Sequence, residues 1–487
     1  MRKGMMTTSL RAVMTMGTLL FSALAQEEKP ATVPSGVEKE ALQAADLFYY
    51  PKDPRTGKMW DTWLTFHDGT YYLYYLANAG QNWNNISLAV STDGVHWKEH
   101  GPILTKRPQT TWMGTGSTWQ SPNFEQDGKW YINYSEWIGP RQTIFFAEST
   151  NLVDWTPLGD EFEFVQDERW YEPNGRWDCI WTIPRPGGGL YGYWTATPKA
   201  RGVFGFGQSL DGARWEALEP PETPGVPGGE VGAVERIGDR YYMLFGMYYQ
   251  NWTMMTLLAD RPEGPFSQAP KNRVLLSGGD TYFARFLRSP DGLLVNHHCM
   301  ADWVYFGPLK TALVDAEGTL RLGWWRGNEA LKAGRKRMPL KQEAPGPSSP
   351  LTFLQPSCDF TKGVILEGRL PIPQSEAAPP VGLFFEAPGS ELGTVIRIEA
   401  SGVTKFGRSK ADGSEFQVAK TVNREWPFGT EARFRLLLQG SLLEFYLDDL
   451  HIEVYRLPLA TTGRIGVWNG DEPLDLDEWR AWGTKRE

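Results

Sequence analysis

Three acidic residues occupy matching places in separate segments of this 487-residue chain. Asp61 in MWDTWLTF, Asp178 in RWDCIW and Glu230 in GGEVGA each precede a tight-turn signal and lie among apolar or small residues. Cleavage of a glycosidic bond usually needs two carboxyl groups that flank the bond, one of them protonated. Carboxyl groups crowded in a pocket of low dielectric raise one another's pKa, and a third can hold sugar hydroxyls. The pattern favours these three residues as the catalytic acids of a glycosidase, provided that the fold brings them together.

The turn signals themselves repeat along the chain. Five segments combine a tight turn with an aromatic, alternating strand: HDGTYYLYYL, QDGKWYINYS, GGGLYGYWTA, GDRYYMLFG and PDGLLVNHH. They recur roughly every 50–60 residues, which is about the length of one four-stranded propeller blade. A second repeat, STDGVHW, STNLVDW and SLDGARW, follows the first three hairpins at similar intervals. We therefore predict a five-bladed β-propeller, in which the strand before each turn lines the axis and carries its acid into a shared central pocket.

The same strands supply candidates for binding a sugar. Blade 2 offers Ser117 and Gln120, and blade 5 offers Tyr282 and Arg285 beside Asp280. Aromatic rings that flank these places and could stack on a sugar, with core packing as the alternative for each, are Trp60, Trp63, Trp119 and Trp177. His297 and His298 are adjacent on the fifth hairpin, so an alternating strand can point only one of them at the axis. A weak resemblance to glycoside hydrolase family 43 propellers implies that an axial histidine helps to hold a central ion, and an ordinary strand histidine is the alternative.

Composition divides the chain into segments. Positive charge before a short apolar run, and an Ala-Leu-Ala site at residues 23–25, predict a signal peptide over 1–25 and a leader over 26–44. The propeller is expected over 45–340 and a Pro/Ser/Gly linker over 341–350. Residues 351–487 alternate without the blade signature, which is typical of a lectin-like or jelly-roll β-sandwich. The predicted fold is thus all-β, with a five-bladed β-propeller followed by a C-terminal β-sandwich.

Charge and cysteine content narrow the function classes. A formal net charge of −9 argues against nucleic acid or an anionic membrane as a partner. No later stretch is long and apolar enough for a membrane helix, so we expect a secreted or periplasmic protein. Three cysteines, Cys179, Cys299 and Cys358, form neither a disulfide framework nor a metal-binding spacing, and buried free thiols are favoured over one bridge. No phosphate loop, serine-nucleophile elbow or H-E-x-x-H pattern is evident, and the expected chemistry needs neither cofactor nor metal.

At these motifs the chain resembles glycoside hydrolase family 32, the invertase, levanase and inulinase group, and more distantly family 43, the arabinanase and xylosidase group. The segment MWDTWLTFHDGTYYLYY resembles the family's first strand and hairpin, RWDCIW its Arg-Asp-Pro segment, and GGEVGAVERIGDRYYMLF its Glu-Cys strand. The resemblance implies that Asp61 is the nucleophile, Glu230 the acid/base and Asp178 the transition-state stabiliser, with Arg176 at the place of the family's arginine. It also implies the propeller-plus-sandwich fold. This chain lacks the family's Asn, Pro and Gly around Asp61, and Trp177 separates Arg176 from Asp178.

Together these observations predict a glycosidase that cleaves terminal furanosides, β-fructofuranosides first, by double displacement with retention. Two alternatives stay open at this stage. One is an inverting pentosidase of the family 43 kind, in which the carboxyl groups are expected to lie farther apart than in a retaining enzyme. The other is a carbohydrate-binding propeller without catalysis, against which the three acids argue. In all three cases the expected partner is a carbohydrate.

Overall fold

The computed structural model describes residues 44–80, 82–343, 351–355, 359–458, 464–470 and 473–483. The predicted signal peptide, almost all of the predicted leader, most of the predicted linker, and Cys358 lie outside the described residues. Within them helical structure is confined to α1 (Phe124–Asp127) and four short 3₁₀ turns, η1 (Asp160–Phe162), η2 (Arg326–Lys332), η3 (Phe360–Lys362) and η4 (Ala400–Gly402). No helix in this part of the chain is long and apolar enough to cross a membrane. The two cysteines that the structure describes, Cys179 and Cys299, are free and buried.

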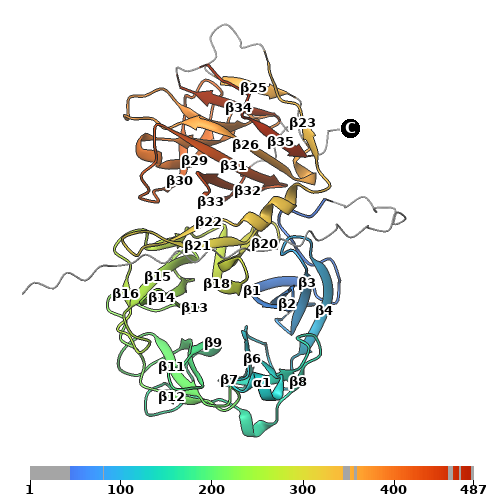
Figure 1. Cartoon of the computed structure of the whole chain (residues 1–487), viewed down its shortest axis with the longest axis vertical. Coiled ribbons are helices and arrows are strands. Elements are labelled where there is room, and N and C mark those ends of the chain that lie inside the picture. Colours follow the sequence, from blue (N-terminus) through green and yellow to red (C-terminus); the bar gives the residue numbers. More distant parts are fainter. Residues whose placement is uncertain are drawn as a thin grey trace, which may run out of the picture. The chain divides into compact units, whose positions relative to one another are not determined.

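The first part of the chain forms antiparallel blades around a common centre (Figure 1). Blade 1 consists of β1 (Lys58–His67), β2 (Thr70–Asn78), β3 (Asn85–Ser91) and β4 (Lys98–Thr105). Blade 2 consists of β5 (Thr118–Gln120), β6 (Trp130–Ile138), β7 (Arg141–Ser149) and β8 (Thr156–Pro157). Blade 3 consists of β9 (Trp177–Pro184), β10 (Leu190–Ala196), β11 (Phe204–Ser209) and β12 (Glu216–Leu218). Blade 4 consists of β13 (Glu230–Ile237), β14 (Arg240–Met247), β15 (Thr253–Ala259) and β16 (Ser267–Gln268), with β17 (Val274–Leu276) also paired to β15.

The fifth blade is joined to the second domain. It consists of β18 (Thr281–Ser289), β19 (Gly292–Met300), β21 (Lys310–Val314) and β22 (Leu320–Trp324), with β20 (Val304–Phe306) paired to β19. A single backbone pairing, Gly323 with Leu450, connects β22 to a strand of the sandwich. Four blades are therefore separate sheets, whereas the fifth continues into an 11-stranded sheet. The predicted five-bladed propeller is confirmed, with this merged last blade.

The hairpin turns explain why Asp-Gly and Gly-Asp recur. The pairings of His67 with Thr70 and of Ile237 with Arg240 each leave a two-residue turn between innermost and second strands. Asp68 has φ of 44° and Gly69 of 73°, the left-handed values that such a turn needs. Blade 5 has the same two-residue spacing. The prediction fails for blade 2, where α1 lies between β5 and β6, and blade 3 uses a five-residue loop between β9 and β10.

The second repeat forms the turn between the third and fourth strands of a blade. Ser91 Oγ accepts a hydrogen bond from the backbone N–H of Gly94, and Asp93 Oδ1 accepts from those of Val95 and His96. Ser149 with Asn151, and Ser209 with Asp211, repeat this pattern in the next two blades. Side chains of this kind replace the backbone partners that a turn lacks.

Hydrophobic clusters between neighbouring blades hold the innermost strands in place. Residues of blades 1 and 2 share one cluster, those of blades 2 and 3 a second, and those of blades 3 and 4 a third. The rings of Trp63, Trp177 and Trp194 are fully buried in these layers. Each large apolar side chain buried in this way stabilises the fold by about 1.5–3 kcal/mol. The tryptophan-rich composition thus first serves the packing of blades.

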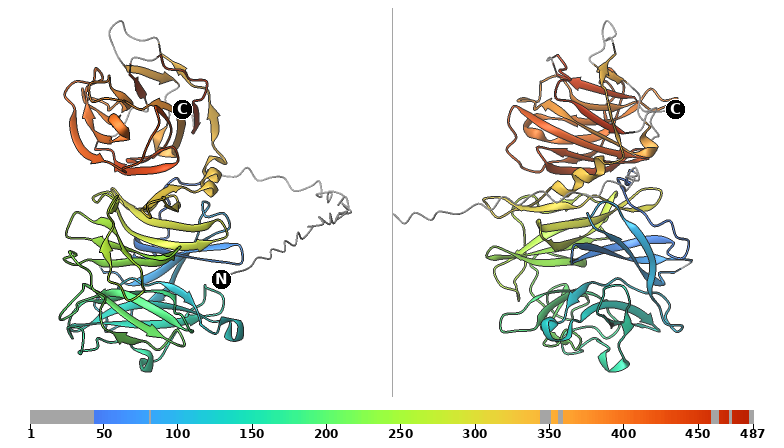
Figure 2. Two further views of the ribbon diagram at one scale, coloured as in Figure 1. Left: turned by 60° about the vertical axis from the view of Figure 1, so that its left-hand side comes forward. Right: turned by 45° about the vertical axis from the view of Figure 1, so that its right-hand side comes forward.

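The C-terminal domain is a two-layered β-sandwich, drawn in orange and red in Figure 2. One layer contains β33 (Leu450–Arg456), β32 (Leu442–Leu447), β31 (Glu431–Gln439), β26 (Val364–Pro371), β35 (Arg480–Gly483) and β23 (Lys336–Met338). The other contains β24 (Lys341–Gln342), β25 (Leu351–Gln355), β34 (Ile465–Asn469), β27 (Val381–Phe385), β28 (Gly393–Ile398), β29 (Thr404–Ser409) and β30 (Gln417–Val422). Apolar side chains of both layers form one core. Strand β23 pairs with β35, and β24 pairs with β25. The first two strands of the sandwich therefore lie at 336–342, on either side of the end of the propeller predicted at residue 340.

Candidate active site

The three acids singled out in the sequence line one pocket of the propeller. Asp61, Asp178 and Glu230 all contribute to the wall of a cavity of about 530 Å³. They lie near the first residues of β1, β9 and β13, which are the innermost strands of blades 1, 3 and 4. Figure 1 shows these strands around the centre of the ring. Three blades therefore deliver one carboxyl group each to the same end of the axis.

A β-bulge interrupts the innermost strand at or beside each acid. The pairing of β1 with β2 shifts at Asp61, which itself has φ of 39°. The pairing of β9 shifts directly after Asp178, where Cys179 has φ of 48°, and that of β13 shifts two residues after Glu230. Bulges re-aim side chains and are frequent next to active sites, and positive φ in a non-glycine residue is a local strain. The strands thus turn their acids into the pocket at a local cost in backbone energy.

Arg176 connects two of the acids. Its Nη2 lies 2.8 Å from Glu230 Oε1 and 3.2 Å from Asp178 Oδ2. The two carboxylates share one guanidinium nitrogen, so they lie on adjoining walls of the cavity. Burial opposes the charge of Arg176, but both carboxylates raise the pKa of its guanidinium, which stays charged.

Asp178 is fixed by a chain of hydrogen bonds behind the pocket. Ser135 donates through Oγ to Asp178 Oδ1 at 2.6 Å, and Gln142 Nε2 donates to Ser135 Oγ at 2.8 Å. A side chain at Gly114 would place its Cβ 2.6 Å from Asp178 Oδ1 and 2.2 Å from Ser135 Oγ. Glycine is therefore required at this position to leave room for the oriented carboxylate.

Asp61 differs from the other two acids in that its carboxyl group has no ion-pair partner among the described residues. It is 9% exposed, and its Oδ1 has no hydrogen-bond partner among the described residues. Burial raises its pKa well above the ordinary value, and the nearby Glu230 adds to this effect. Burial also raises the pKa of Asp178, against the opposing influence of Arg176. A carboxyl oxygen in a pocket that no described residue hydrogen-bonds is a candidate nucleophile, because its lone pairs are open to the substrate.

Three of the nine predicted substrate-binding residues belong to this site. Trp60 and Arg176 line the cavity, and Tyr282 donates a hydrogen bond to Glu230 Oε2 at 2.7 Å. The ring of Trp60 lies 5.6 Å from that of Trp252 and 6.0 Å from that of Trp83. Aromatic rings thus line the same pocket as the acids, which suits an apolar sugar face.

The other six lie outside the cavity, which corrects the expectation for them. Trp63 and Trp177 are fully buried between blades, and Trp119 is buried with its Nε1 donating to Gly212 O. Gln120 is exposed in a separate groove. Ser117 donates to the backbone carbonyl of Ile180 and Arg285 to that of Gly116, so both are buried beneath the pocket.

Many of the residues that line the pocket were not predicted from the sequence. Lys58, Trp83, Trp112, Tyr248 and Trp252 line the cavity but come from outside the turn pattern. Tyr248 and Trp252 lie in the connection between β14 and β15, where they are 44% and 36% exposed. The only signal in the sequence is the unusual density of aromatics in YYQNW (248–252).

The two adjacent histidines face opposite ways, as strand alternation predicts. The ring of His298 lies 4.5 Å from that of Trp60, on the pocket side. His297 points away toward the sandwich, where its ring lies near that of His451. Burial lowers the pKa of His298 to about 3, so this residue is neutral and acts as packing behind Trp60.

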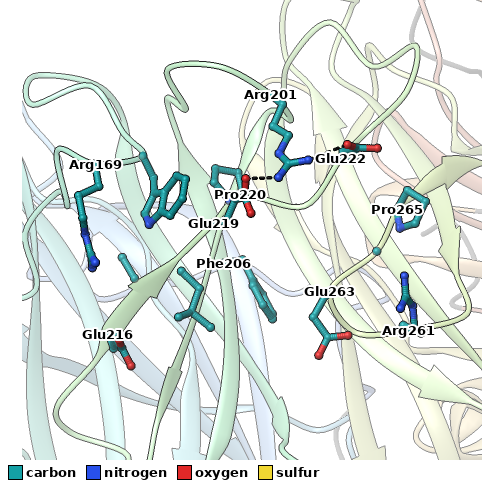
Figure 3. Close-up of a pocket in the computed structure, with 14 residues that line it drawn as sticks. Arg169, Arg201, Phe206, Glu216, Glu219, Pro220, Glu222, Arg261, Glu263 and Pro265 are labelled. Carbon is teal, nitrogen blue, oxygen red and sulfur yellow. Dashed lines mark hydrogen bonds and ion pairs between the residues drawn. The ribbon is translucent and has the colours of Figure 1, made fainter.

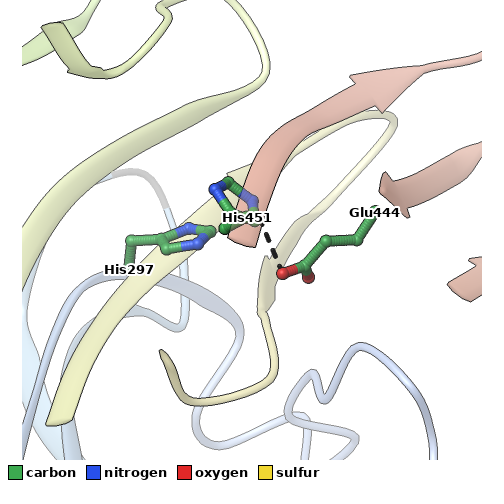
Figure 4. A group of neighbouring side chains, drawn as sticks. All are labelled: His297, Glu444 and His451. Carbon is green, nitrogen blue, oxygen red and sulfur yellow. Dashed lines mark ion pairs between the residues drawn. The ribbon is translucent and has the colours of Figure 1, made fainter. Parts of the chain in front are cut away.

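His297, Glu444 and His451 form a buried cluster with metal-ligand chemistry (Figure 4). Their ligand atoms lie within 4.8 Å of one another. However, Lys310 Nζ, also fully buried, lies 2.6 Å from Glu444 Oε1. The ammonium group already neutralises the carboxylate, and a second cation beside it would be repelled. We interpret the cluster as a buried ion pair between propeller and sandwich.

A larger cleft, of about 660 Å³, lies along blades 3 and 4 (Figure 3). Arg201 bridges Glu219 and Glu222 there. All four acids of its wall, Glu216, Glu219, Glu222 and Glu263, are exposed. The cleft offers no buried acid for proton transfer, so its size does not make it a better candidate than the axial pocket.

No family model and no curated protein matches the sequence. The structure is similar to a family 32 β-fructofuranosidase of Bombyx mori in complex with sucrose, at 15% identity, with a TM-score of 0.66 over 89% of this chain and 95% of that one. The fold is that of the family 32 fructofuranosidases. A sucrose-6-phosphate hydrolase of Lactobacillus gasseri (13% identity, TM-score 0.65, 92% and 94% covered) and a fructofuranosidase of Schwanniomyces occidentalis complexed with fructose (12%, 0.63, 93% and 100%) are also similar. The predicted resemblance is confirmed at the level of the fold.

Proposed function

We propose that this protein is a glycoside hydrolase that cleaves terminal furanosides, most closely a β-fructofuranosidase, with retention of configuration. The observation that supports it best is the convergence of Asp61, Asp178 and Glu230 in one pocket, with Arg176 joining the last two. A binding protein has no need for three carboxyl groups from three blades. The solved structures of similar fold are named as fructofuranosidases and a sucrose-6-phosphate hydrolase, which agrees with this class of substrate.

In the proposed mechanism Asp61 attacks the anomeric carbon of the terminal sugar while Glu230 protonates the leaving oxygen. The glycosidic C–O bond breaks as the ester bond to Asp61 Oδ forms, and the oxocarbenium-like transition state lies between them. Glu230, now ionised, then takes a proton from water, which attacks the anomeric carbon and releases Asp61. Asp178 and Arg176 hold ring hydroxyls during both steps. Every proton and electron pair is supplied by these residues, the sugar and water.

We also propose that the protein is exported and acts outside the cytoplasm. The substrate would be an oligosaccharide or polysaccharide outside the cytoplasm, which suits a chain whose residues 1–25 read as a signal peptide. Detection of a mature chain beginning near residue 26 in a periplasmic or culture fraction tests this part of the proposal separately from the activity.

The decisive experiment compares Asp61→Asn and Glu230→Gln with the parent on sucrose, inulin, levan and arabinan. Both variants should lose turnover by at least about 10³-fold while still binding the sugar by calorimetry. Glu235→Gln is the matched control, since Glu235 lies on the same strand as Glu230, is buried, and pairs with Arg288 away from the pocket. If both acid variants hydrolyse as well as the parent, the assignment is wrong.

The same assay separates the alternatives. NMR of the first product anomer distinguishes retention from the inversion expected of a family 43-type pentosidase. Sugar binding by the parent without any hydrolysis would identify a non-catalytic carbohydrate-binding propeller.

A further inference from the structure

Arg285 is a fully buried cation without an acidic partner. It comes from β18 of blade 5, and its Nη1 donates to the backbone carbonyl of Gly116 at 2.7 Å. Its Nε and Nη2 have no hydrogen-bond partner, and within the described residues no carboxylate lies at ion-pair distance from it. Burying a charge without a partner is costly. We therefore expect Arg285 to have a role that offsets the energetic cost of its burial.

The surroundings place Arg285 directly beneath the catalytic acids. Its guanidinium carbon lies 5.9 Å from the ring of Trp63, 5.5 Å from that of Trp181 and 4.5 Å from that of Phe283. Trp63 follows Asp61 by two residues on β1, and Trp181 follows Asp178 by three on β9. Gly116 is next to Thr115, which lines the pocket. This side chain of blade 5 therefore lies against the innermost strands of blades 1 and 3 and against the segment that leads into blade 2.

The three acids of the pocket differ in whether a cation pairs with them. Arg176 pairs with Asp178 and Glu230, whereas Asp61 has no ion pair within the described part of the chain. Asp61 is the residue that must be ionised to attack carbon, and it is buried. Arg285 is the remaining buried cation near it.

We propose that Arg285 is a positioning residue that, from beneath the pocket, holds the carboxyl group of Asp61 in the ionised form that nucleophilic attack requires. This inference rests on the proposed function, because it assigns a partner to the proposed nucleophile. In this role Arg285 does not touch the substrate, in place of the sugar-binding role predicted for it from the sequence. Its aromatic surroundings keep water away and so lengthen the reach of its charge.

The electrostatics of the neighbourhood agree with this role. Burial, and then the carboxylates of Glu230 and Asp178, raise the pKa of Asp61, while Arg285 lowers it more than Arg176 does. Burial lowers the pKa of Arg285, and the charges that oppose this include Asp61 and Asp178. The titratable and charged groups facing this pair are Asp178, Glu230, Arg176, Cys179 and Tyr282, with neutral His298 behind Trp60.

The test compares the pH dependence of kcat/KM for the parent, Arg285→Gln and Arg285→Lys. Glutamine can keep a hydrogen bond to Gly116 but removes the charge, and lysine keeps the charge. We expect the acidic limb to move up by about one pH unit in Arg285→Gln and to stay near the parent's in Arg285→Lys. Arg424→Gln is the matched control, since Arg424 is a buried arginine of the sandwich that donates to backbone carbonyls. An acidic limb that does not move in Arg285→Gln, or that moves equally in the control, overturns the inference.

A second measurement does not depend on turnover. Asp61→Asn should raise Tm at neutral pH, and raise it more in the Arg285→Gln background, because the buried carboxylate has then lost its cation. Both gains should shrink toward low pH, where Asp61 is protonated. Equal gains in the two backgrounds contradict the inference. Arg285→Gln alone could fail to fold. In that case, folding of the Asp61→Asn/Arg285→Gln double variant supports the coupling. Failure of both variants to fold shows that the role of Arg285 is purely structural.

The two proposals fail in distinguishable ways. A parent without activity on any furanoside refutes the proposed function, while unequal Tm gains would still show that Arg285 and Asp61 are coupled. An active parent with an unmoved acidic limb refutes only the role of Arg285.

Discussion

The phenolic hydroxyl of Tyr282 donates a hydrogen bond to Glu230 Oε2 at 2.7 Å. The two residues come from the innermost strands of neighbouring blades, and the ring of Tyr282 stands edge-on to that of Trp252 at 4.9 Å. Burial, and then Glu230, raise the pKa of Tyr282 above its usual range, so the hydroxyl stays protonated and remains a donor. One oxygen of Glu230 is thus held by Tyr282 and the other by Arg176. The acid/base is oriented from two sides.

Tyr282→Phe should lower kcat/KM by about 2–10-fold, because the acid/base loses one of the two groups that orient it, and a hydrogen bond contributes about 0.5–1.5 kcal/mol. The ring stays in place, so Tm should change little. Tyr242→Phe is the control, since that buried tyrosine of blade 4 donates to the carbonyl of Gly318 away from the pocket. Steady-state kinetics and thermal unfolding of both variants check the prediction. Equal losses of activity in the two variants would contradict it.

The acidic limb of kcat/KM should report Asp61. Burial raises the pKa of this carboxyl group well above its usual value, so the nucleophile becomes protonated at a higher pH than an ordinary aspartate. A raised pKa in the folded state also means that the protonated form adds stability at low pH, and that this stability is lost as pH rises through the folded pKa. Activity should therefore fall on acidification without loss of the fold through this group. A rate profile with parallel Tm measurements tests this, and a constant kcat/KM down to pH 4 contradicts it.

The sequence predicted those parts of the site that depend on strand order. Asp61, Asp178 and Glu230 each precede a turn on an innermost strand, and the repeat of turns is enough to place them at one end of the ring. Arg176 was found through the family resemblance. The bulges at these strands left no recognisable signal, although they decide which side chains face the pocket.

The sequence did not predict which tryptophans line the pocket and which pack between the blades. Trp60 lines the pocket and Trp63 is packed between blades, although both flank the same acid. Trp252 lines the pocket from a connection whose path no local pattern predicts. Whether a ring packs or binds is decided by the tertiary arrangement, because burial of aromatic area is favourable in both places.

Trp252→Ala should weaken binding of the sugar that follows the cleaved bond. The exposed ring stands at the pocket rim next to Trp60, and loss of one stacking contact of about 0.5–1.5 kcal/mol lowers kcat/KM roughly 2–10-fold. The effect should be seen on oligosaccharides and be smaller on a methyl or nitrophenyl furanoside. Trp303→Ala, at a similarly exposed tryptophan that does not line the pocket, is the control. Equal effects on long and short substrates would exclude this role.

The buried pair of Lys310 and Glu444 should matter for stability rather than catalysis. Lys310→Met leaves the buried carboxyl group of Glu444 without its cation, next to the buried imidazoles of His297 and His451. Breaking such a pair costs about 3–5 kcal/mol, whereas removing both charges costs much less. Tm should therefore fall sharply in Lys310→Met and recover in Lys310→Met/Glu444→Gln. The control Lys271→Met, which breaks an exposed ion pair with Glu317, should leave Tm unchanged.

A chelator should not lower the Tm of the parent, because Lys310 supplies the positive charge that a metal ion would. A chelator-induced fall in Tm, or additive losses in the double variant, would show that the cluster holds a metal instead.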